Sequence, residues 1–183
     1  MTTIDDVTLR VIDALNACDS QHMLVGSFSS NLYGIPRSTK DCDFVLHLQG
    51  DLSPVFYKTL GNDFEMYPQL KFETNTGTFK QEMRFLGTQF TVELFRLSDD
   101  EFDQERFRRR VPAKLFGRQT FVPTAEDVIV MKLRWFRPKD QPDVLNVMTV
   151  QRGRLDWPYI ESWCRRHGSL ARMEEVRKSV REI

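Results

Sequence analysis

The sequence predicts a mixed α/β (α+β) fold, with a largely antiparallel sheet, flanking helices and additional C-terminal helices. An apolar run at residues 22–25 and three strand-like runs between residues 69 and 95 predict the sheet, while apolar residues at helical spacing predict the helices. A chain of 183 residues and 21.6 kDa can bury one substantial core. We therefore predict a main domain over residues 1–150 and a helical extension over residues 151–183, packed on the same domain.

The N-terminal part is predicted to alternate helices with strands. Val7, Val11 and Leu15 repeat at helical spacing, and acidic residues in the first turn suit the helix dipole. A Ser-Pro pair starts the second long helix, because proline suits the first helical turn. The expected elements are a helix over 3–18, a strand over 22–25, a short helix ending at Gly34, a strand over 41–48 and a helix over 53–61.

Strands dominate the middle of the chain, and helices dominate its end. Glycine-containing turns separate the three strand-like runs, which predicts an antiparallel meander. Ser98 with Glu101 resembles a capping box, and Thr124 resembles a helix cap. The expected elements are strands over 69–74, 78–85 and 89–95, a helix over 98–109, a hairpin over 114–122, a helix from 124, and helices over 141–150, after 156, and from 169 to the end.

The segment from Gly26 to Asp43 carries the most informative motif. Gly26 and Ser27 follow a buried strand and open a short helix, whose first backbone N–H groups suit phosphate oxygens. Asp41 and Asp43 stand two residues apart in a predicted strand, so both carboxylates point to one face. Two convergent carboxylates attract a hard cation such as Mg²⁺. The motif therefore predicts a site that binds both phosphates and metal.

This motif resembles the signature of the polymerase-β-like nucleotidyltransferase superfamily, with Arg37 shortly before the two acids. A second block, over residues 124–133, 137–140 and 143–144, resembles small bacterial stand-alone members related to AbiEii-type toxins. The two blocks and the strands between them cover residues 20–150. The resemblance implies a nucleotidyltransferase-like fold, an NTP substrate, two Mg²⁺ ions, and either a tRNA end or a protein side chain as acceptor. It also implies a partner antitoxin.

Nucleotidyl transfer with two metals usually needs a third carboxylate, and Glu93 is the best candidate. It lies in an apolar strand, where an acid facing the core would be costly without ions or partners. We predict that Asp41, Asp43 and Glu93 are catalytic and hold the metals, and that Glu93 also helps to deprotonate the acceptor. Many relatives have aspartate at the matching position. The alternative is that Glu93 lies on the solvent face of an edge strand.

Four residues are predicted to bind the nucleotide: Gly26, Ser27, Arg37 and Lys132. Lys132 stands among apolar residues on a helix, where it could reach phosphates as a point charge. Three of these residues have a structural alternative: a helix cap for Ser27, the shaping of a turn for Arg37 and a solvated helix face for Lys132. Arg137 and Asp140 also match family positions, although roles at helix ends explain them equally well.

Composition gives the chain no global preference for nucleic acid or membrane. Lys and Arg number 26 and so do Asp and Glu, so any such attraction must be local. The three cysteines lack metal-ligand spacing, no apolar stretch is long enough to span a bilayer, and the first residues do not resemble a signal peptide. We therefore expect reduced thiols, a cytoplasmic location and no membrane partner.

Three functions remain open from the sequence. The first is a Mg²⁺-dependent nucleotidyltransferase that acts on a hydroxyl acceptor as part of a toxin–antitoxin system. The second is a catalytically degenerate binding module of the same fold, which recognises a nucleotide, RNA or a protein partner. The third is an RNA-binding accessory protein that uses two cationic groups with nearby tryptophans. Those cationic groups are residues 106–110, and Arg165, Arg166, Arg172, Arg177, Lys178 and Arg181.

Overall fold

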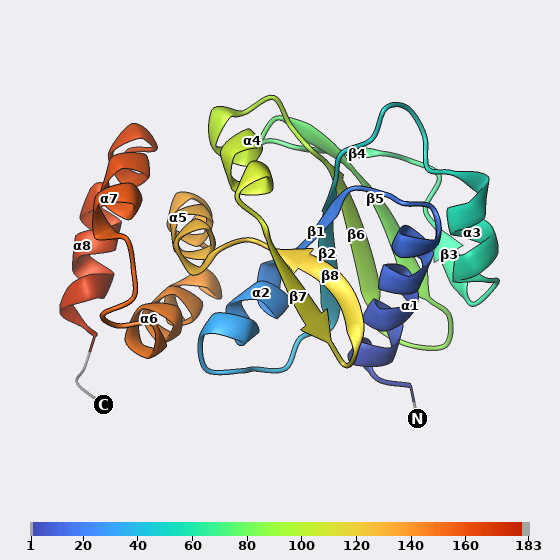
Figure 1. The fold of residues 1–183 in the computed structure, drawn as a ribbon, viewed down its shortest axis with the longest axis horizontal. Coiled ribbons are helices and arrows are strands. Elements are labelled where there is room, and N and C mark those ends of the chain that lie inside the picture. The colour runs from blue at the N-terminus through green and yellow to red at the C-terminus, as the bar shows by residue number, and fades with distance from the viewer. Residues whose placement is uncertain (1, 181–183) are drawn as a thin grey trace.

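A mixed six-stranded sheet forms the centre of one half of the molecule, and a group of four helices forms the other half (Figure 1). The computed structural model describes residues 2–180. The helices are α1 (Ile4–Ala17), α2 (Gly26–Tyr33), α3 (Pro54–Leu60), α4 (Glu101–Arg108), α5 (Ala125–Trp135), α6 (Asp140–Val150), α7 (Trp157–Arg166) and α8 (Leu170–Lys178). The strands are β1 (His22–Val25), β2 (Asp41–Leu46), β3 (Phe64–Met66), β4 (Lys71–Glu73), β5 (Thr78–Phe85), β6 (Thr91–Arg96), β7 (Val111–Leu115) and β8 (Arg118–Val122).

The sheet has the order β1-β2-β6-β5-β3, and β4 also pairs with β5. Strands β2 and β6 are parallel, while every other pair in the sheet is antiparallel. The predicted mixed, largely antiparallel sheet with flanking helices is confirmed. The β7–β8 hairpin forms a separate two-stranded sheet.

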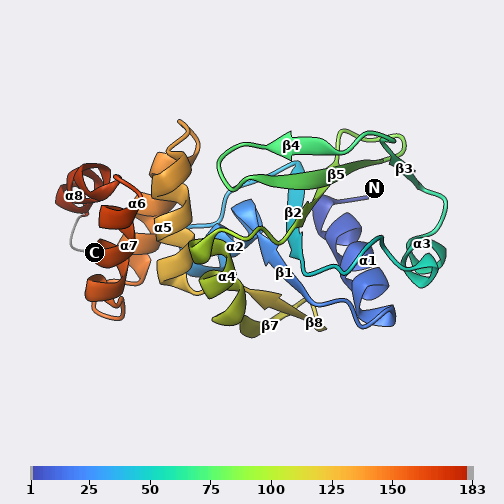
Figure 2. The ribbon, with the colours of Figure 1, turned by 90° about the horizontal axis from the view of Figure 1, so that it is seen from above.

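The two faces of the sheet differ in what covers them. Cys42, Phe44 and Leu46 of β2 are buried in the main core, with apolar residues from α1, α3 and β8. The alternation of a strand sends Asp41 and Asp43 to the opposite face. There a small apolar cluster containing Val45 and Phe107 leaves room for a polar site. The side of the sheet that faces away from α1 therefore carries the candidate chemistry (Figure 2).

Helices α5, α6, α7 and α8 share a second hydrophobic core, which also includes Phe102 of α4. This core contains residues on both sides of the predicted boundary at residue 150. Helix α2 contacts both α5 and α6, so the motif helix lies between the sheet and the helical group. The division at residue 150 stays a prediction. None of the helices within residues 2–180 is long and apolar enough to cross a membrane.

Local capping explains where several helices begin. Thr3 and Asp6 form a capping box at α1, and Thr124 accepts a hydrogen bond from the Asp127 amide at α5. The predicted capping box of Ser98 with Glu101 is wrong. Asp100 caps α4 instead, because its carboxylate accepts two amides of the first turn, whereas Ser98 donates to the buried Asp103 carboxylate at 2.6 Å.

Two other details differ from the sequence prediction. The short strand β3 was not expected, because only three residues pair with β5 and they carry no clear alternation. The last predicted helix appears as α8, which ends at Lys178, and residues 181–183 lie outside the described residues.

Candidate active site

Three carboxylates converge on one face of the sheet. The parallel register of β2 and β6 places Asp43 opposite Glu93 and Asp41 opposite Thr91, so the three acidic side chains share a face. All three acids line one cavity of about 340 Å³ between the sheet and α5. Glu93 therefore lies in the interior strand β6, and its predicted alternative, the solvent face of an edge strand, is wrong.

Gly26 allows the close approach of Asp43 to the start of α2. Its φ of +65° suits glycine, and a Cβ atom at this position would lie 2.0 Å from Asp43 Oδ2. Burial, together with the neighbouring Glu93 and Asp41 charges, raises the pKa of Asp43 to about 7. This carboxylate is thus packed against backbone and short of positive partners. Such a group is chemically suited to a cation.

Glu93 differs from the two aspartates because it already forms a close ion pair with a lysine. Lys80 Nζ lies 2.6 Å from Glu93 Oε1 and 3.1 Å from Glu82 Oε1. Within residues 2–180, no group of three or more His, Cys, Asp or Glu side chains has an arrangement that could hold a metal ion. The donor set that fits a divalent cation is the pair Asp41 and Asp43, since Mg²⁺ is commonly held by one or two carboxylates and completed by substrate phosphates and water.

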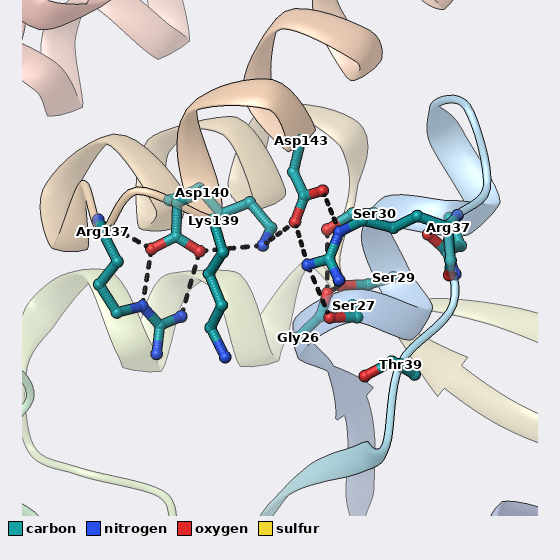
Figure 3. Close-up of polar contacts among 12 residues, drawn as sticks. Gly26, Ser27, Ser29, Ser30, Arg37, Thr39, Arg137, Lys139, Asp140 and Asp143 are labelled. Carbon is teal, nitrogen blue, oxygen red and sulfur yellow. Dashed lines mark hydrogen bonds and ion pairs between the residues drawn. The ribbon is translucent and has the colours of Figure 1, made fainter. Parts of the chain in front are cut away.

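A buried network of ion pairs lies beside the acids, at the start of α6 (Figure 3). Lys132 Nζ lies 3.2 Å from Asp140 Oδ1 and 2.8 Å from Asp143 Oδ2. Arg137 also binds the Asp140 carboxylate, with Nε at 2.7 Å and Nη2 at 3.1 Å. On the other side, Arg37 binds both Asp143 oxygens, with Nε at 2.7 Å and Nη2 at 2.9 Å. The network joins α5, α6 and the loop before β2.

These pairs keep both network aspartates ionised. Burial by itself would raise the pKa of Asp140 and of Asp143. The hydrogen bonds from Arg137 and Lys132 lower the pKa of Asp140, and those from Arg37 and Lys132 lower that of Asp143. The network is therefore electrostatically satisfied.

The predicted nucleotide-binding residues fall into two groups. Gly26 and Lys132 line the cavity with the acids. Ser27 and Arg37 contact each other, with Arg37 Nη2 donating to Ser27 Oγ at 3.0 Å, and Arg37 lines a groove next to α1 and the β7–β8 hairpin. A nucleotide role for all four residues stays a prediction. The observed contacts of Ser27 and Arg37 hold the start of α2 against the α6 network.

Sequence reasoning missed three charged residues around the site. Lys80 lies on β5, two residues before Glu82. Opposite charges two residues apart in a strand were the sequence pattern that could have indicated an ion pair on one face. Lys139 lines the cavity, and its Nζ lies 3.9 Å from Asp41 Oδ2. Figure 3 shows that the Lys139 and Arg137 side chains extend in the same direction from the start of α6. Lys139 and Asp143 were noted only within the second block, and Asp143 connects Arg37 with Lys132.

Most of the predicted cationic groups are engaged within the protein. Arg106 pairs with Asp103 at 2.6 Å, and Arg109 pairs with Asp127 at 3.4 Å. In the C-terminal group, Arg177 pairs with Glu161 and lies over the Trp157 ring. Trp163 packs on Phe102 and is covered by Arg166, and Arg181 lies outside the described residues. These contacts favour a structural role over an RNA-binding surface.

The sequence matches one known protein family over nearly its whole length. Residues 4–182 match the family described as "Nucleotidyltransferase of unknown function (DUF6036)". The chain belongs to this family. Its membership agrees with the acids, the glycine turn and the mixed sheet, while the predicted link to AbiEii-type toxins stays a prediction. None of the curated proteins compared with this nucleotidyltransferase-family chain matches it.

Solved structures of similar fold are also nucleotidyltransferases by description. The antibiotic-resistance factor ANT(2'')-Ia is 12% identical with a TM-score of 0.59, and the match covers 96% of each chain. The same protein in complex with adenylyl-2''-tobramycin is 14% identical with a TM-score of 0.57, covering 89% of this chain and 97% of that one. An antigenic nucleotidyltransferase-like protein from Paracoccidioides brasiliensis is 14% identical with a TM-score of 0.55, covering 97% and 94%. At these identities the similarity shows the fold.

Proposed function

We propose that this family member is an active enzyme that transfers a nucleoside monophosphate from an NTP to a hydroxyl group and releases pyrophosphate. The observation that supports this most is the convergence of Asp41, Asp43 and Glu93 on one cavity, with Gly26 packed against Asp43. A site of this kind lowers the barrier mainly by positioning and by neutralising charge.

The cavity is lined by both acidic and basic residues, and each kind suits one part of the reaction. A divalent cation held by Asp41 and Asp43 would neutralise charge on the triphosphate. Lys139, Arg137 and Lys132 line the same cavity and would attract the phosphate oxygens. The first amides of α2, which has no side-chain cap, would donate hydrogen bonds to the phosphates. Together these groups would bind the nucleotide beside the acids.

In this proposal Glu93 receives the proton of the acceptor hydroxyl. The acceptor oxygen forms a bond to the α-phosphorus, the bond from that phosphorus to the bridging oxygen breaks, and pyrophosphate leaves with the electron pair. The proton of the hydroxyl goes to Glu93, whose carboxylate the Lys80 ammonium holds in place at 2.6 Å. Asp143 pairs with Lys132 of α5 and with Arg37, which also donates to Ser27 of α2, so these contacts hold α5, α6 and the start of α2 together around this chemistry.

The acceptor is proposed to be a tRNA end or a protein side chain, as the resemblance to AbiEii-type toxins implies, with an antitoxin as partner. The three cysteines are free, in keeping with the cytoplasmic location expected from the sequence. Because a structure of similar fold contains a nucleotidylated small molecule, adenylyl-2''-tobramycin, aminoglycosides belong among the acceptors to test.

The test uses NTPs labelled at different phosphates. Purified protein is incubated with Mg²⁺, each of the four NTPs, and either tRNA, cell-extract protein or an aminoglycoside panel. We expect label from the α-phosphate to reach one acceptor, and label from the γ-phosphate to leave as pyrophosphate. The Asp41→Asn, Asp43→Asn double variant should lose this transfer, whereas Asp51→Asn, an exposed aspartate after the same strand, should keep it. Equal labelling by the double variant rejects the proposal.

A second function, a degenerate nucleotide-binding module, is favoured by the ion pair between Lys80 and Glu93. An enzyme and a binding module would both bind NTP, so calorimetry does not separate them. Nucleotide binding that depends on Asp43, without transfer to any acceptor and without pyrophosphate release, would support the binding module.

A further inference from the structure

Three carboxylates stand in one row across three neighbouring strands. Asp43 on β2 is opposite Glu93 on β6, and Glu93 is in turn opposite Glu82 on β5. Directly opposite side chains have Cβ atoms about 4.5–5.5 Å apart, and like charges in such pairs are destabilising. This row therefore needs positive charge close by.

Lys80 supplies that charge at one end of the row. It stands two residues before Glu82 on β5, so its side chain shares the acidic face. Its ammonium lies 2.6 Å from Glu93 and 3.1 Å from Glu82, and 5.4 Å from the centre of the Phe95 ring. The side chain is only 18% exposed, and it lines the cavity. Glu93 thus already has its cation.

The other end of the row lacks an equivalent partner. Lys139 approaches Asp41 at 3.9 Å, with its side chain 52% exposed, and Thr91 donates a hydrogen bond to Asp41 Oδ1 at 3.1 Å. Within the described residues, no ion pair is formed to Asp43 that would match the one between Lys80 and Glu93. The shortage of positive charge is therefore confined to Asp41 and Asp43.

We propose that this chain holds one divalent cation, on Asp41 and Asp43, and that the Lys80 ammonium takes the place of a second cation beside Glu93. Lys80 is then a positioning residue: it fixes Glu93 toward the cavity and occupies the space that a second ion would need. The role of Lys80 in catalysis rests on the proposed function, whereas the number of bound ions does not depend on that function. The proposal replaces the two ions expected from the sequence with one.

The test counts Mn²⁺ on the full chain by electron paramagnetic resonance and by calorimetry, with Mn²⁺ alone and with Mn²⁺ plus α,β-methylene-ATP. Two Mn²⁺ ions in a shared carboxylate site lie about 3.5–4 Å apart and give a spin-coupled spectrum. We expect the wild-type chain with Mn²⁺ alone to bind one uncoupled ion, and Asp43→Asn to lose it. We expect no coupled pair in wild type when the nucleotide analogue is added.

Removing the lysine should open a second position. In Lys80→Met we expect a second Mn²⁺ and a coupled spectrum, and in the Lys80→Met, Glu93→Gln double variant we expect one ion again. Lys71→Met is the matched control, because Lys71 also contacts Glu82 but is more exposed, and it should leave the count at one.

Several results would overturn the proposal. They are two ions or a coupled spectrum in the wild-type chain, no bound ion at all, or no second ion in a folded Lys80→Met variant. If Lys80→Met does not fold, Glu93→Gln in the wild-type background decides: an unchanged count supports the proposal, and a lower count overturns it. One bound ion without nucleotidyl transfer would reject the proposed function and leave the ion count standing.

Discussion

Two pairs of aspartates lie close to the same cavity, and they differ in how their charge is balanced. Asp140 and Asp143 on α6 are almost fully buried, yet Lys132, Arg137 and Arg37 surround them. Asp41 and Asp43 on β2 are less buried, and the ion pair between Lys139 and Asp41 is long, at 3.9 Å, while Lys139 and Arg137 act on Asp43 only as neighbouring charges. The pKa values follow this contrast: those of the α6 pair are lowered, and that of Asp43 is raised to about 7.

The contrast distinguishes carboxylates that stabilise the fold from carboxylates that can bind a ligand. A buried acid with complete ion pairs holds elements together, and removing one partner leaves an uncompensated charge. An acid that is packed against backbone without a cation costs stability in the free protein, and this cost is typical of functional sites. We therefore assign the α6 aspartates to the scaffold and the β2 pair to ligand binding.

The largest expected effect concerns the scaffold. Lys132→Met should lower the free energy of unfolding by about 4 kcal/mol, because it leaves two buried carboxylates without their shared cation. Lys58→Met, at an exposed position of α3, is the control and should change stability little. Urea denaturation of both variants measures the difference. Similar stability of Lys132→Met and wild type would show that the network carries no structural role.

A smaller effect is expected from the glycine turn. Gly26→Ala should lower nucleotidyl transfer about 100-fold, because the added Cβ would push Asp43 away from its position. Gly50→Ala is the matched control: Gly50 also has a positive φ, of +102°, but nothing lies within 4 Å of its added Cβ. Transfer is measured with α-labelled NTP. Equal losses in both variants would assign the effect to backbone strain alone.

Much of this site could be predicted from the sequence because its signals are local. The spacing of Asp41 and Asp43 is enough to put both side chains on one face of a strand. The apolar strand around Glu93 indicated an inward-facing acid, and the register of β2 with β6 confirms that it faces the same cavity. Helix starts with a simple cap, such as Thr124, were also predictable.

The missed features depend on contacts between residues far apart in the sequence. Lys80 and Glu93 are 13 positions apart, and their pairing depends on the register of two strands. Arg37 and Asp143 are 106 positions apart, so no local pattern indicates that they bind each other. The cap of α4 was mistaken because Ser98 and Asp100 both suit a helix start, and only the buried contact of Ser98 with Asp103 separates them.

The measurement that tests the contrast most directly compares one chemical change in the two pairs, Asp43→Asn and Asp143→Asn, without divalent cations. In the folded wild-type chain Asp43 keeps its proton up to pH about 7, whereas its ordinary pKa is 3.8. Its ionisation therefore lowers stability as the pH rises through this window, and asparagine avoids that loss.

At pH 8 we expect Asp43→Asn to raise the free energy of unfolding by about 2 kcal/mol, a gain that shrinks at pH 5. Asp143→Asn should instead lower it at pH 8, because it weakens the pairs with Arg37 and Lys132. Urea denaturation of wild type and both variants at pH 5 and pH 8 gives four differences in the free energy of unfolding, one for each variant at each pH. A loss of stability in Asp43→Asn at pH 8, equal to that in Asp143→Asn, would contradict the assignment of the β2 pair to ligand binding.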